Sequence, residues 1–348
     1  MSRKIKIGLV YRDNTFSSPI NPDVTRGWAD ASDPCIEEAY IARALIEDSE
    51  DRFEVYNVPH FGIDPDTLYA DATNLETGEE IHRHIDTIAD VLFVLALGKA
   101  GVPNRRQHLA RENELLAKMH SDALVPVVNN IPSILAYRNR PKSYLFDLQE
   151  RGVPVAPSRL AHSIDQVRAY GEELGGTYVT KPVSGFGGIG IEKFPDGDEE
   201  TVRRQLKEWG EVIVQRFIPE IVTEGERSFF LIEGVPRYGI LKSAPEGSFK
   251  VNAEYGADKD LSEVYKRMSP TAEEKALCVQ ALEALPIDPE IVRIDCVGFR
   301  DRPMIGEVTK NCIGTYANEL GALDEIVNGY IGTMLINTAR RSPPYVGP

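Results

Sequence analysis

A lysine followed closely by several glycines is the first feature of this sequence that could do chemistry. Residues 178–194 read YVTKPVSGFGGIGIEKF, with Lys181 ahead of four glycines at positions 185–190. A plain hairpin turn needs only one or two glycines. Because glycine has no Cβ, such a backbone can approach a phosphate and offer its N–H groups, and a lysine adds a positive charge. The segment therefore favours a phosphate-binding hairpin, with a ligand-free irregular hairpin as the alternative.

Two carboxylates within apolar patterns form the second feature. Residues 292–311 read VRIDCVGFRDRPMIGEVTKN, with Asp295 in one predicted strand and Glu307 in the next. A buried carboxylate is costly unless it is paired or binds a metal. Two carboxylates on adjacent strands can point the same way and hold Mg²⁺, which prefers oxygen ligands and phosphates. Pairing with Arg293 or Arg300 is the alternative that stays open.

A strand end followed by a proline turn forms the third feature. Residues 212–242 read VIVQRFIPEIVTEGERSFFLIEGVPRYGILK, in which the first strand is expected to end over residues 215–218. Apolar side chains and backbone groups at such an end are suited to the edge of an adenine base.

The elements that must position these residues follow from hydrophobic periodicity. Apolar runs at residues 5–11, 89–97 and 125–130 are typical of strands covered on both faces, with helical spacing at 35–48 and 104–120 between them. Repeated strand–helix–strand units predict a parallel sheet. From about residue 131 strand-like runs dominate, and helices are predicted at residues 141–152, 163–176, 199–209, 271–285 and 318–341.

Size and composition restrict the class of protein. The 348 residues suffice for two or three domains, and the net charge of −15 argues against a general nucleic-acid binder. The longest apolar run, at residues 91–97, is shorter than the roughly 20 residues of a membrane span. The N-terminal segment enters a strand at once and lacks the features of a signal peptide. We therefore expect a cytoplasmic protein without nucleic-acid or membrane partners.

Cysteine and histidine give no strong metal signal. The cysteines are Cys35, Cys278, Cys296 and Cys312. None form a C-x-x-C pair, so buried free thiols are expected rather than a zinc site or disulfides. The HRH segment at residues 82–84 would place two imidazoles on one face if it were a strand. Because the stretch is polar, we predict a helix or loop there and a solvated surface.

The joint order of these motifs resembles the ATP-grasp superfamily, most of all bacterial glutathione synthetase and the ribosomal-protein glutamate ligases. The resemblance covers roughly residues 125–341, and the N-terminal third is similar to the Rossmann-like domain that precedes such folds. It implies a fold of mixed α/β and α+β class. The implied domains are an N-terminal Rossmann-like parallel-sheet domain (1–130), a central lid subdomain (131–218) and a C-terminal subdomain with the metal-binding strands (219–348).

The resemblance also implies roles for individual residues. The nucleotide would be bound by Lys142, Lys181, Ser184, Gly185, Gly187, Gly188, Gln215, Phe217 and Ile218. The metal ligands would be Asp295, Glu307 and Asn311. Catalytic roles would fall to Lys181, Arg227, Lys250 and Asn252.

Two positions depart from the family pattern. Thr309 stands where the family has the asparagine of its E-x-N metal motif, and Asn311 is the proposed substitute. Ser228 stands at the arginine of the family's G-D-x-R loop, with Arg227 one residue early. On a strand one residue means the opposite face. The substrate end of the pocket is therefore expected to differ from that of glutathione synthetase.

The implied activity is ATP-dependent carboxylate–amine ligation, which forms an amide or peptide bond on an amino acid or short peptide. ATP and Mg²⁺ would be required, an acyl phosphate would be the intermediate, and the glycine loop would act as a lid that excludes water. The other partners would be a small carboxylate and an amine, with a homodimer or tetramer left open. The alternatives are a D-alanine–D-alanine ligase-like enzyme, a small-molecule kinase and a nucleotide-binding protein without turnover.

Overall fold

The computed structural model describes residues 3–11, 36–95, 105–139, 142–184, 188–251, 265–286, 290–310 and 329–341. They belong to two compact units, one of Met1–Arg138 with Thr309–Pro348, the other of Asn139–Val308. The segment from Thr309 to Pro348 thus joins the first unit. The predicted division at residues 130 and 218 remains a prediction.

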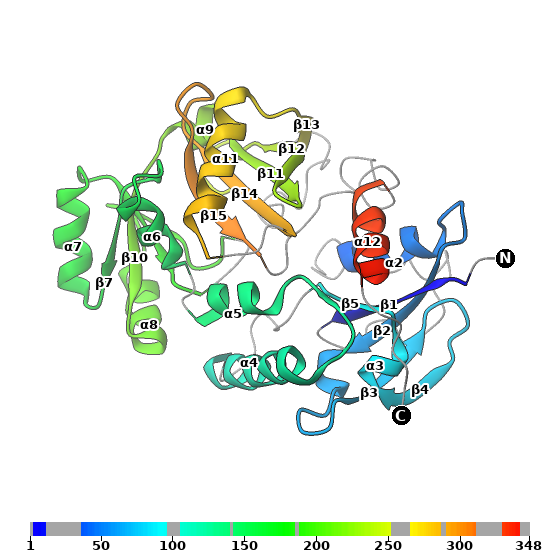
Figure 1. Ribbon diagram of the computed structural model, residues 1–348. Helices are drawn as coiled ribbons and strands as arrows, with labels where there is room; N and C mark the ends of the chain where they lie inside the picture. The colour runs from blue at the N-terminus through cyan, green and yellow to red at the C-terminus, as the bar shows by residue number, and fades with distance from the viewer. Residues whose placement is uncertain are drawn as a thin grey trace. The chain divides into compact units, whose positions relative to one another are not determined.

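The first unit contains a six-stranded sheet in the order β4-β3-β2-β1-β5-β6 (Figure 1). The strands are β1 Ile5–Tyr11, β2 Phe53–Pro59, β3 Tyr69–Asn74, β4 Glu80–His84, β5 Val91–Val94 and β6 Val127–Val128. The predicted parallel sheet is confirmed for β2, β1, β5 and β6, and the β3–β4 hairpin extends it antiparallel.

Helices complete the first unit. They are α2 Ile36–Ile46, α3 Ile85–Ile88, α4 Arg105–Asp122, α5 Ile131–Asn139 and α12 Thr333–Arg341, with the 3-10 helix η1 His60–Gly62. Helix α12 buries Met334, Leu335 and Ile336 and packs on β1 and β5. This packing is the physical reason why the C-terminal segment belongs with the first sheet.

The HRH segment forms strand β4, so the prediction of a helix or loop is wrong. Ile81 pairs with Ala72 of β3, and this cross-strand pairing outweighs the polar sequence. His82 and His84 share one face of the strand, and their Nδ1 atoms lie 2.8 Å from Asp71 and 3.3 Å from Asp86. In the described part of the chain, no group of three or more His, Cys, Asp or Glu side chains is placed to hold a metal ion.

The second unit holds two sheets. The four-stranded sheet has the order β7-β10-β8-β9, with β7 Ser158–Ala161, β10 Val212–Arg216, β8 Tyr178–Pro182 and β9 Glu192–Phe194. Helices α7 Ile164–Glu173 and α8 Glu199–Trp209 cover the face that carries Tyr178, Val212 and Val214. Because strand side chains alternate, Lys181 and Gln215 lie on the opposite face.

The five-stranded sheet has the order β13-β12-β11-β14-β15. Its strands are β11 Glu226–Ile232, β12 Val235–Lys242, β13 Tyr265–Met268, β14 Ile291–Val297 and β15 Met304–Thr309. The helices of this part are α6 Tyr144–Glu150, α9 Glu220–Thr223 and α11 Ala272–Ala284, the last of which lies across β14 and β15 in Figure 1. The prediction that Asp295 and Glu307 lie on adjacent strands is confirmed by β14 and β15.

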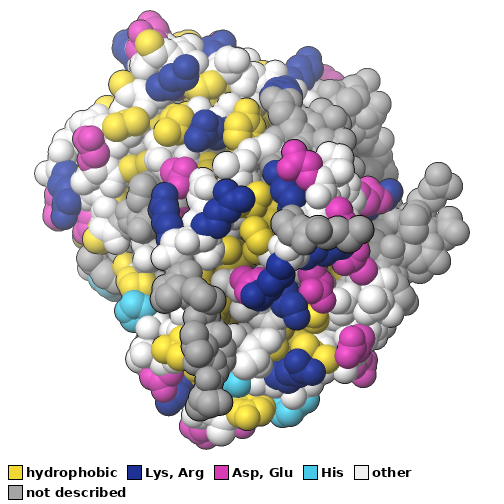
Figure 2. All heavy atoms as spheres, turned by 45° about the vertical axis from the view of Figure 1, so that its right-hand side comes forward, with side chains coloured by type: hydrophobic (Ala, Val, Ile, Leu, Met, Phe, Trp, Pro, Cys, Tyr) yellow, Lys and Arg dark blue, Asp and Glu magenta, His cyan; other side chains and the backbone are white. Residues whose placement is uncertain are grey.

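The surface and the buried thiols agree with the composition. Basic and acidic side chains are interspersed over the face drawn in Figure 2. Cys278 and Cys296 are buried and free, and the other two cysteines lie outside the described residues. None of the described helices is both long and apolar enough to cross a membrane.

Candidate nucleotide and metal site

Side chains of opposite charge gather on one face of the five-stranded sheet. In the strand register Ser228 pairs with Asp295 and Glu226 pairs with Lys242, so these four residues share a face. Arg293 lies two residues before Asp295 on β14. It donates two hydrogen bonds of 3.0 Å to the Asp295 carboxylate, one from Nε and one from Nη2. This fork is a strong arrangement for arginine and carboxylate.

Lys242 adds a second cation to this face. Its buried Nζ lies 2.6 Å from Glu226 Oε1 and 3.9 Å from Asp295 Oδ2. Burial opposes ionisation of Asp295, but the charges of Arg293 and Lys242 outweigh it and hold the pKa of this carboxyl below its usual value. Asp295 is therefore ionised at neutral pH and suited to binding a cation.

Lys142 and Glu307 form a second charged pair beside the same sheet. Lys142 Nζ lies 3.4 Å from Glu307 Oε1, and the Lys142 side chain is buried. Its φ of +54° falls in the left-handed region that non-glycine residues seldom adopt. Tyr144, which begins α6, accepts a 3.0 Å hydrogen bond from the backbone N–H of Val308 on its hydroxyl oxygen. This bond fixes the start of α6 against β15, next to Glu307.

Lys181 joins these groups from the open face of the four-stranded sheet. Burial lowers the pKa of the half-buried Lys181 ammonium, and the neighbouring charge of Lys142 lowers it further. The carboxylates of Glu307, Glu226 and Asp295 act in the opposite direction. Lys181 therefore lies within electrostatic reach of three other predicted site residues, namely Lys142, Asp295 and Glu307.

The donor set fits a magnesium nucleotide. Mg²⁺ is usually bound by one or two carboxylates together with substrate phosphates, rather than by a cage of protein ligands. Asp295 and Glu307 on adjacent strands offer carboxylate oxygens of the kind that bind Mg²⁺, and the two lysines carry charges of the sign that phosphate oxygens attract.

The glycine hairpin is described at its two ends. Ser184 and Gly188 are described, whereas Gly185 and Gly187 lie outside the described residues. Gly190 has a φ of +74°, and a Cβ there would lie 2.7 Å from Nε2 of Gln205. That amide donates a 2.7 Å hydrogen bond to the Gly190 carbonyl. Helix α8 therefore anchors the end of the loop at a position that only glycine fits.

The segment predicted to bind adenine, residues 215–218, includes the end of strand β10 and the two residues that follow it. The Gln215 side chain is buried and donates to Ser158 Oγ at 2.9 Å. The N–H of Phe217 donates to the Thr177 carbonyl at 3.2 Å, and the Ile218 carbonyl accepts from Ile221 at 3.1 Å. A base that bound the Phe217 N–H or the Ile218 carbonyl would share or replace the backbone hydrogen bonds that these groups make here.

An aromatic and cationic cluster stands beside this segment and was not predicted. The Phe217 and Phe249 rings meet edge to face at 5.9 Å, and Lys193 Nζ lies 4.1 Å from the Phe217 ring centre. Lys193 pairs with Val179 in the β8–β9 register, so it shares a face with Lys181. The alternation of strand side chains was the signal that could have placed Lys193 on this face.

Arg227 is not brought into the charged cluster. It pairs with Leu241 and Cys296 and faces the side of the sheet opposite to Asp295. There its buried Nε lies 2.6 Å from the buried Glu274 Oε1 of α11. We therefore replace the predicted catalytic role of Arg227 with a structural one, an ion pair that joins α11 to the sheet.

The remaining predicted residues are placed only in part. Lys250 donates its backbone N–H to Ser248 Oγ at 3.0 Å, and Asn252 and Asn311 lie outside the described residues. Thr309 ends β15, two residues after Glu307, and is buried. Sequence reasoning missed Lys242 and Glu226 in this cluster and considered Arg293 only as an alternative partner. A period-two count from Asp295 and Ser228 would have placed Arg293 and Glu226 on the same face.

Comparisons with known proteins show similarity to one domain family. Residues 148–283, within the second unit, match the family model described as prokaryotic glutathione synthetase, ATP-grasp domain. A glutathione synthetase from Parasynechococcus marenigrum (strain WH8102) is 27% identical over 150 residues, which are 41% of this chain and 46% of that protein. The match thus spans about half the length of this curated relative.

Solved structures share the fold over nearly the whole chain. D-alanyl-alanine synthetase A from Vibrio cholerae has a TM-score of 0.61 at 13% identity, covering 98% of this chain and 99% of that one. D-alanine–D-alanine ligase from Bacillus anthracis, complexed with ATP, has a TM-score of 0.59 at 16% identity, covering 97% and 98%. The ATP-grasp ligase PsnB, complexed with minimal precursor, Mg and ADP, has a TM-score of 0.55 at 14% identity, covering 96% and 98%.

At these identities the structural similarity concerns the fold. The match to the family model comes from the sequence itself and covers β7 to β13. Residues 148–283 are therefore similar to the ATP-grasp domain of prokaryotic glutathione synthetase, and the chain shares its fold with a solved ATP-grasp ligase.

Proposed function

We propose that this protein is an ATP-dependent ligase that joins a carboxylate to an amine through an acyl phosphate. The observation that carries the proposal is the grouping of Lys142, Lys181, Asp295 and Glu307 within one unit. Two neighbouring lysines repel each other, and the phosphates of ATP would relieve this repulsion. The substrates we infer are amino acids or short peptides.

Each residue has a proposed role in binding. Lys142 and Lys181 bind the phosphates, and Asp295 and Glu307 hold Mg²⁺. When bound, Mg²⁺ neutralises phosphate charge and orients the transferred phosphoryl group. Arg293 and Lys242 keep the Asp295 carboxylate ionised and oriented. Ser184, Gly188 and the rest of the glycine loop bind the phosphates through backbone N–H groups.

The proposed reaction has two steps. An oxygen of the substrate carboxylate attacks the γ-phosphorus, and the bond to the bridging oxygen breaks to release ADP. The amine then attacks the acyl carbon, the carbon–oxygen bond to phosphate breaks, and the amine gives up a proton as phosphate leaves. The protein contributes by positioning the reactants and neutralising charge.

The experiment measures ADP release by the purified protein with Mg²⁺ and ATP. Amino acids and dipeptides are offered singly and in pairs, with mass spectrometry of the products. ADP that requires a pair, with a product formed by loss of one water, supports the ligase. ADP with a single compound and a phosphorylated product identifies a kinase instead. Lys181→Met is the matched inactive control.

A further inference from the structure

Lys142 has a strained backbone that its surroundings must hold in place. Its φ of +54° lies in the left-handed region, and for residues other than glycine such conformations persist only where neighbouring structure fixes them. The Lys142 carbonyl accepts a 3.1 Å hydrogen bond from the N–H of Leu145, so Lys142 forms the turn that enters α6. Its side chain is 8% exposed, with Nζ 3.4 Å from Glu307 Oε1 on β15. The contacts that hold this turn therefore also fix where the Lys142 ammonium points.

The hydroxyl of Tyr144 ties this turn to β15. Its oxygen accepts a 3.0 Å hydrogen bond from the buried backbone N–H of Val308, the residue that follows Glu307. Tyr144 lies two residues after Lys142, so the hydrogen bond and the Lys142–Glu307 ion pair close one ring of contacts through residues 142–144 and 307–308. Each of the two contacts therefore restrains the geometry of the other.

The hydroxyl of Tyr144, rather than its ring, makes this connection. The side chain is buried, and a phenylalanine ring would fill the same space. Only the hydroxyl oxygen can accept the hydrogen bond, however, and a buried N–H without a partner is costly. At Ile305, three residues earlier on β15, the N–H donates to a backbone carbonyl, that of Pro154, at 2.8 Å. At Val308 a side chain takes the place of such a carbonyl, and this links the strand to the Lys142 turn.

We propose that Tyr144 is a positioning residue whose hydroxyl fixes the Lys142 ammonium in the place from which it binds nucleotide phosphate. The inference rests on the proposed function, because that function assigns phosphate binding to Lys142. Tyr144 itself acts through the ring of contacts and not on the nucleotide. A cation that is already ordered loses less conformational freedom on binding, so the hydroxyl should contribute to nucleotide affinity.

The first test needs no nucleotide and measures coupling within the ring of contacts. It is a double-mutant cycle of Tyr144→Phe and Glu307→Gln, followed by urea unfolding. Because the hydrogen bond and the ion pair restrain each other, Tyr144→Phe should lower the ratio of folded to unfolded protein less in the Glu307→Gln background, by a factor of at least about three. Losses that simply add would overturn the proposal.

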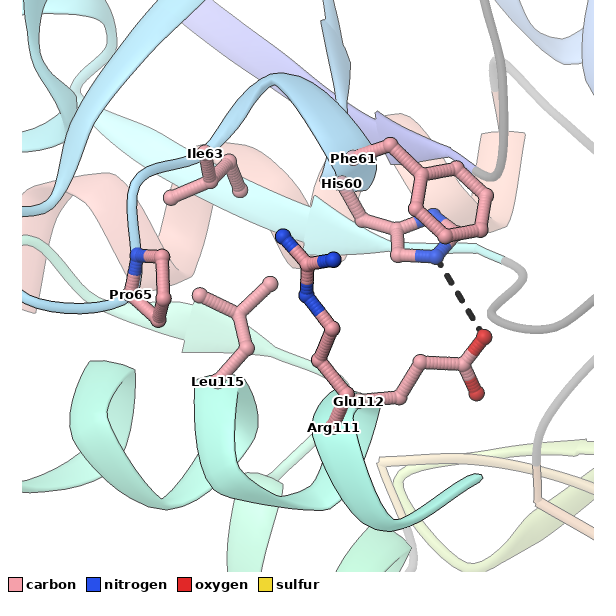
Figure 3. A pocket seen from close by; sticks show the side chains of 7 residues that line it. All are labelled: His60, Phe61, Ile63, Pro65, Arg111, Glu112 and Leu115. Carbon is pink, nitrogen blue, oxygen red and sulfur yellow. Dashed lines mark ion pairs between the residues drawn. The ribbon is translucent and has the colours of Figure 1, made fainter. Parts of the chain in front are cut away.

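The matched control for this cycle is a second ion pair of the same length. His60 Nε2 lies 3.4 Å from Glu112 Oε1 in the first unit, between η1 and α4 (Figure 3). The cavity beside this pair measures about 10 Å³, the space of one water molecule, which leaves no room for a larger ligand. Glu112 lies outside the ring of contacts, so Glu112→Gln and Tyr144→Phe should reduce stability additively.

The second test measures nucleotide binding in the absence of any other substrate. Tyr144→Phe should raise the calorimetric Kd for ATP with Mg²⁺ about fivefold to tenfold, the effect of one hydrogen bond. In the Lys142→Met background the same change should raise the Kd by less than about twofold, because the cation that Tyr144 positions is gone. Tyr178→Phe removes a hydroxyl from the face of the four-stranded sheet that α7 and α8 cover, and it should leave the Kd unchanged.

The two tests separate failure of this proposal from failure of the proposed function. An unchanged Kd in Tyr144→Phe, or an equal rise with and without Lys142, would overturn the positioning role even if the ligase reaction is observed. A wild-type protein that binds no ATP would instead contradict the proposed function. Coupling or additivity in the unfolding cycle would then support or overturn the role of Tyr144 in placing Lys142.

Discussion

Lys181 is the residue at which the electrostatics of the site act in opposite directions. Burial and Lys142 lower its pKa, while three carboxylates favour the charged form. Phosphate binding requires the charged form, so nucleotide affinity is linked to the proton on this lysine. In the protein without nucleotide, the same lowered pKa links the free energy of unfolding to pH in the opposite direction. Between the lowered pKa and the ordinary value of 10.5 the unfolded state binds more protons, so the free energy of unfolding rises with pH there.

We predict that affinity for ATP falls as the pH rises through the lowered pKa of Lys181, in the range below its ordinary value of 10.5. Lys181→Arg should bind ATP with little pH dependence over this range, because arginine stays charged. Lys181→Met should bind weakly at every pH. Titration calorimetry across the range checks this, and an equally steep decline in wild type and Lys181→Arg would show that another group is responsible.

Replacing Asp295 and replacing Glu307 should reduce the stability of the protein to different extents, but both changes should remove the same activity. Asp295→Asn leaves the Arg293 fork without its carboxylate, whereas Lys242 keeps Glu226, and we expect a loss of about 1–3 kcal/mol in the free energy of unfolding at neutral pH. Glu307→Gln should lose less, because that side chain is 29% exposed. Both variants should lose Mg²⁺-dependent ATP turnover. Urea unfolding and the ADP assay together check this.

The pH dependence of this effect has a defined sign. Because the pKa of Asp295 is held below its usual 3.8, its carboxylate contributes stability above that value. The contribution is lost as the pH falls from 3.8 through the lowered pKa. The stability difference between wild type and Asp295→Asn should therefore shrink on acidification through this window. A difference that stays constant would contradict the assigned role of Asp295.

The sequence motifs predicted which residues to examine, but they predicted less well on which face of the sheet each side chain lies. Lys142, Lys181, Asp295 and Glu307 were proposed because their motifs follow one another in a recognisable order, and the structure places the other three near Lys181. Arg227 was chosen wrongly, although its one-residue offset from the family pattern already indicated the opposite face. Lys242 could not be assigned from its own surroundings, since only the pairing of β11 with β12 brings it to Glu226 and Asp295.

At the scale of elements, local signals decided which predictions succeeded. Helix α8 was predicted with its observed bounds because Asp198 caps its first turn and Gly210 ends it with a φ of +80°. Strand β4 was missed because its five residues carry one apolar side chain, and only pairing with β3 makes them a strand. Pairing partners are distant in sequence, and no local pattern supplies them.

The Arg227–Glu274 pair should couple α11 to the sheet strongly. Glu274→Leu leaves the buried Arg227 charge without its carboxylate, and we expect a loss of about 3–5 kcal/mol of stability. Arg227→Met should cost less, because Arg300 lies 3.6 Å from Glu274. The double variant should lose less stability than the sum of the two single variants. About 1 kcal/mol of the loss in Glu274→Leu is separate from the ion pair, because Glu274 also caps the helix together with Thr271. Urea unfolding of all four proteins measures the coupling, and additive losses would contradict it.

Gly171 within α7 should resist replacement by alanine. Helix propensity alone favours alanine by about 1 kcal/mol. Here, however, a Cβ would lie 2.0 Å from Cε1 of Tyr178, whose ring stacks on Phe194 at 5.0 Å. Overpacking of this kind costs about 1–3 kcal/mol, so we expect net destabilisation. The exposed Glu172→Ala on the same helix should change stability by under about 0.5 kcal/mol, and a stabilised Gly171→Ala would show that Tyr178 moves freely.

At the scale of the whole molecule, we predict two unfolding transitions, one for each of the two compact units. Leu335→Ala removes a fully buried side chain from α12, which packs on β1 and β5, at a cost of about 2–5 kcal/mol. Val214→Ala does the same on β10 in the second unit. Each variant should shift one calorimetric transition, and a different one in each case. A single transition that both variants shift alike would mean that the two units unfold as one.

The central claim is that a carboxylate oxygen becomes an oxygen of the released phosphate. The most direct test supplies the carboxylate substrate, identified by the ADP assay, with ¹⁸O in its carboxyl group, together with the amine and ATP. Mass spectrometry of the phosphate reports the transfer. The account predicts one ¹⁸O in each phosphate released and one remaining in the amide. Unlabelled phosphate accompanying a condensed product would contradict the acyl phosphate, and with it the proposed reaction.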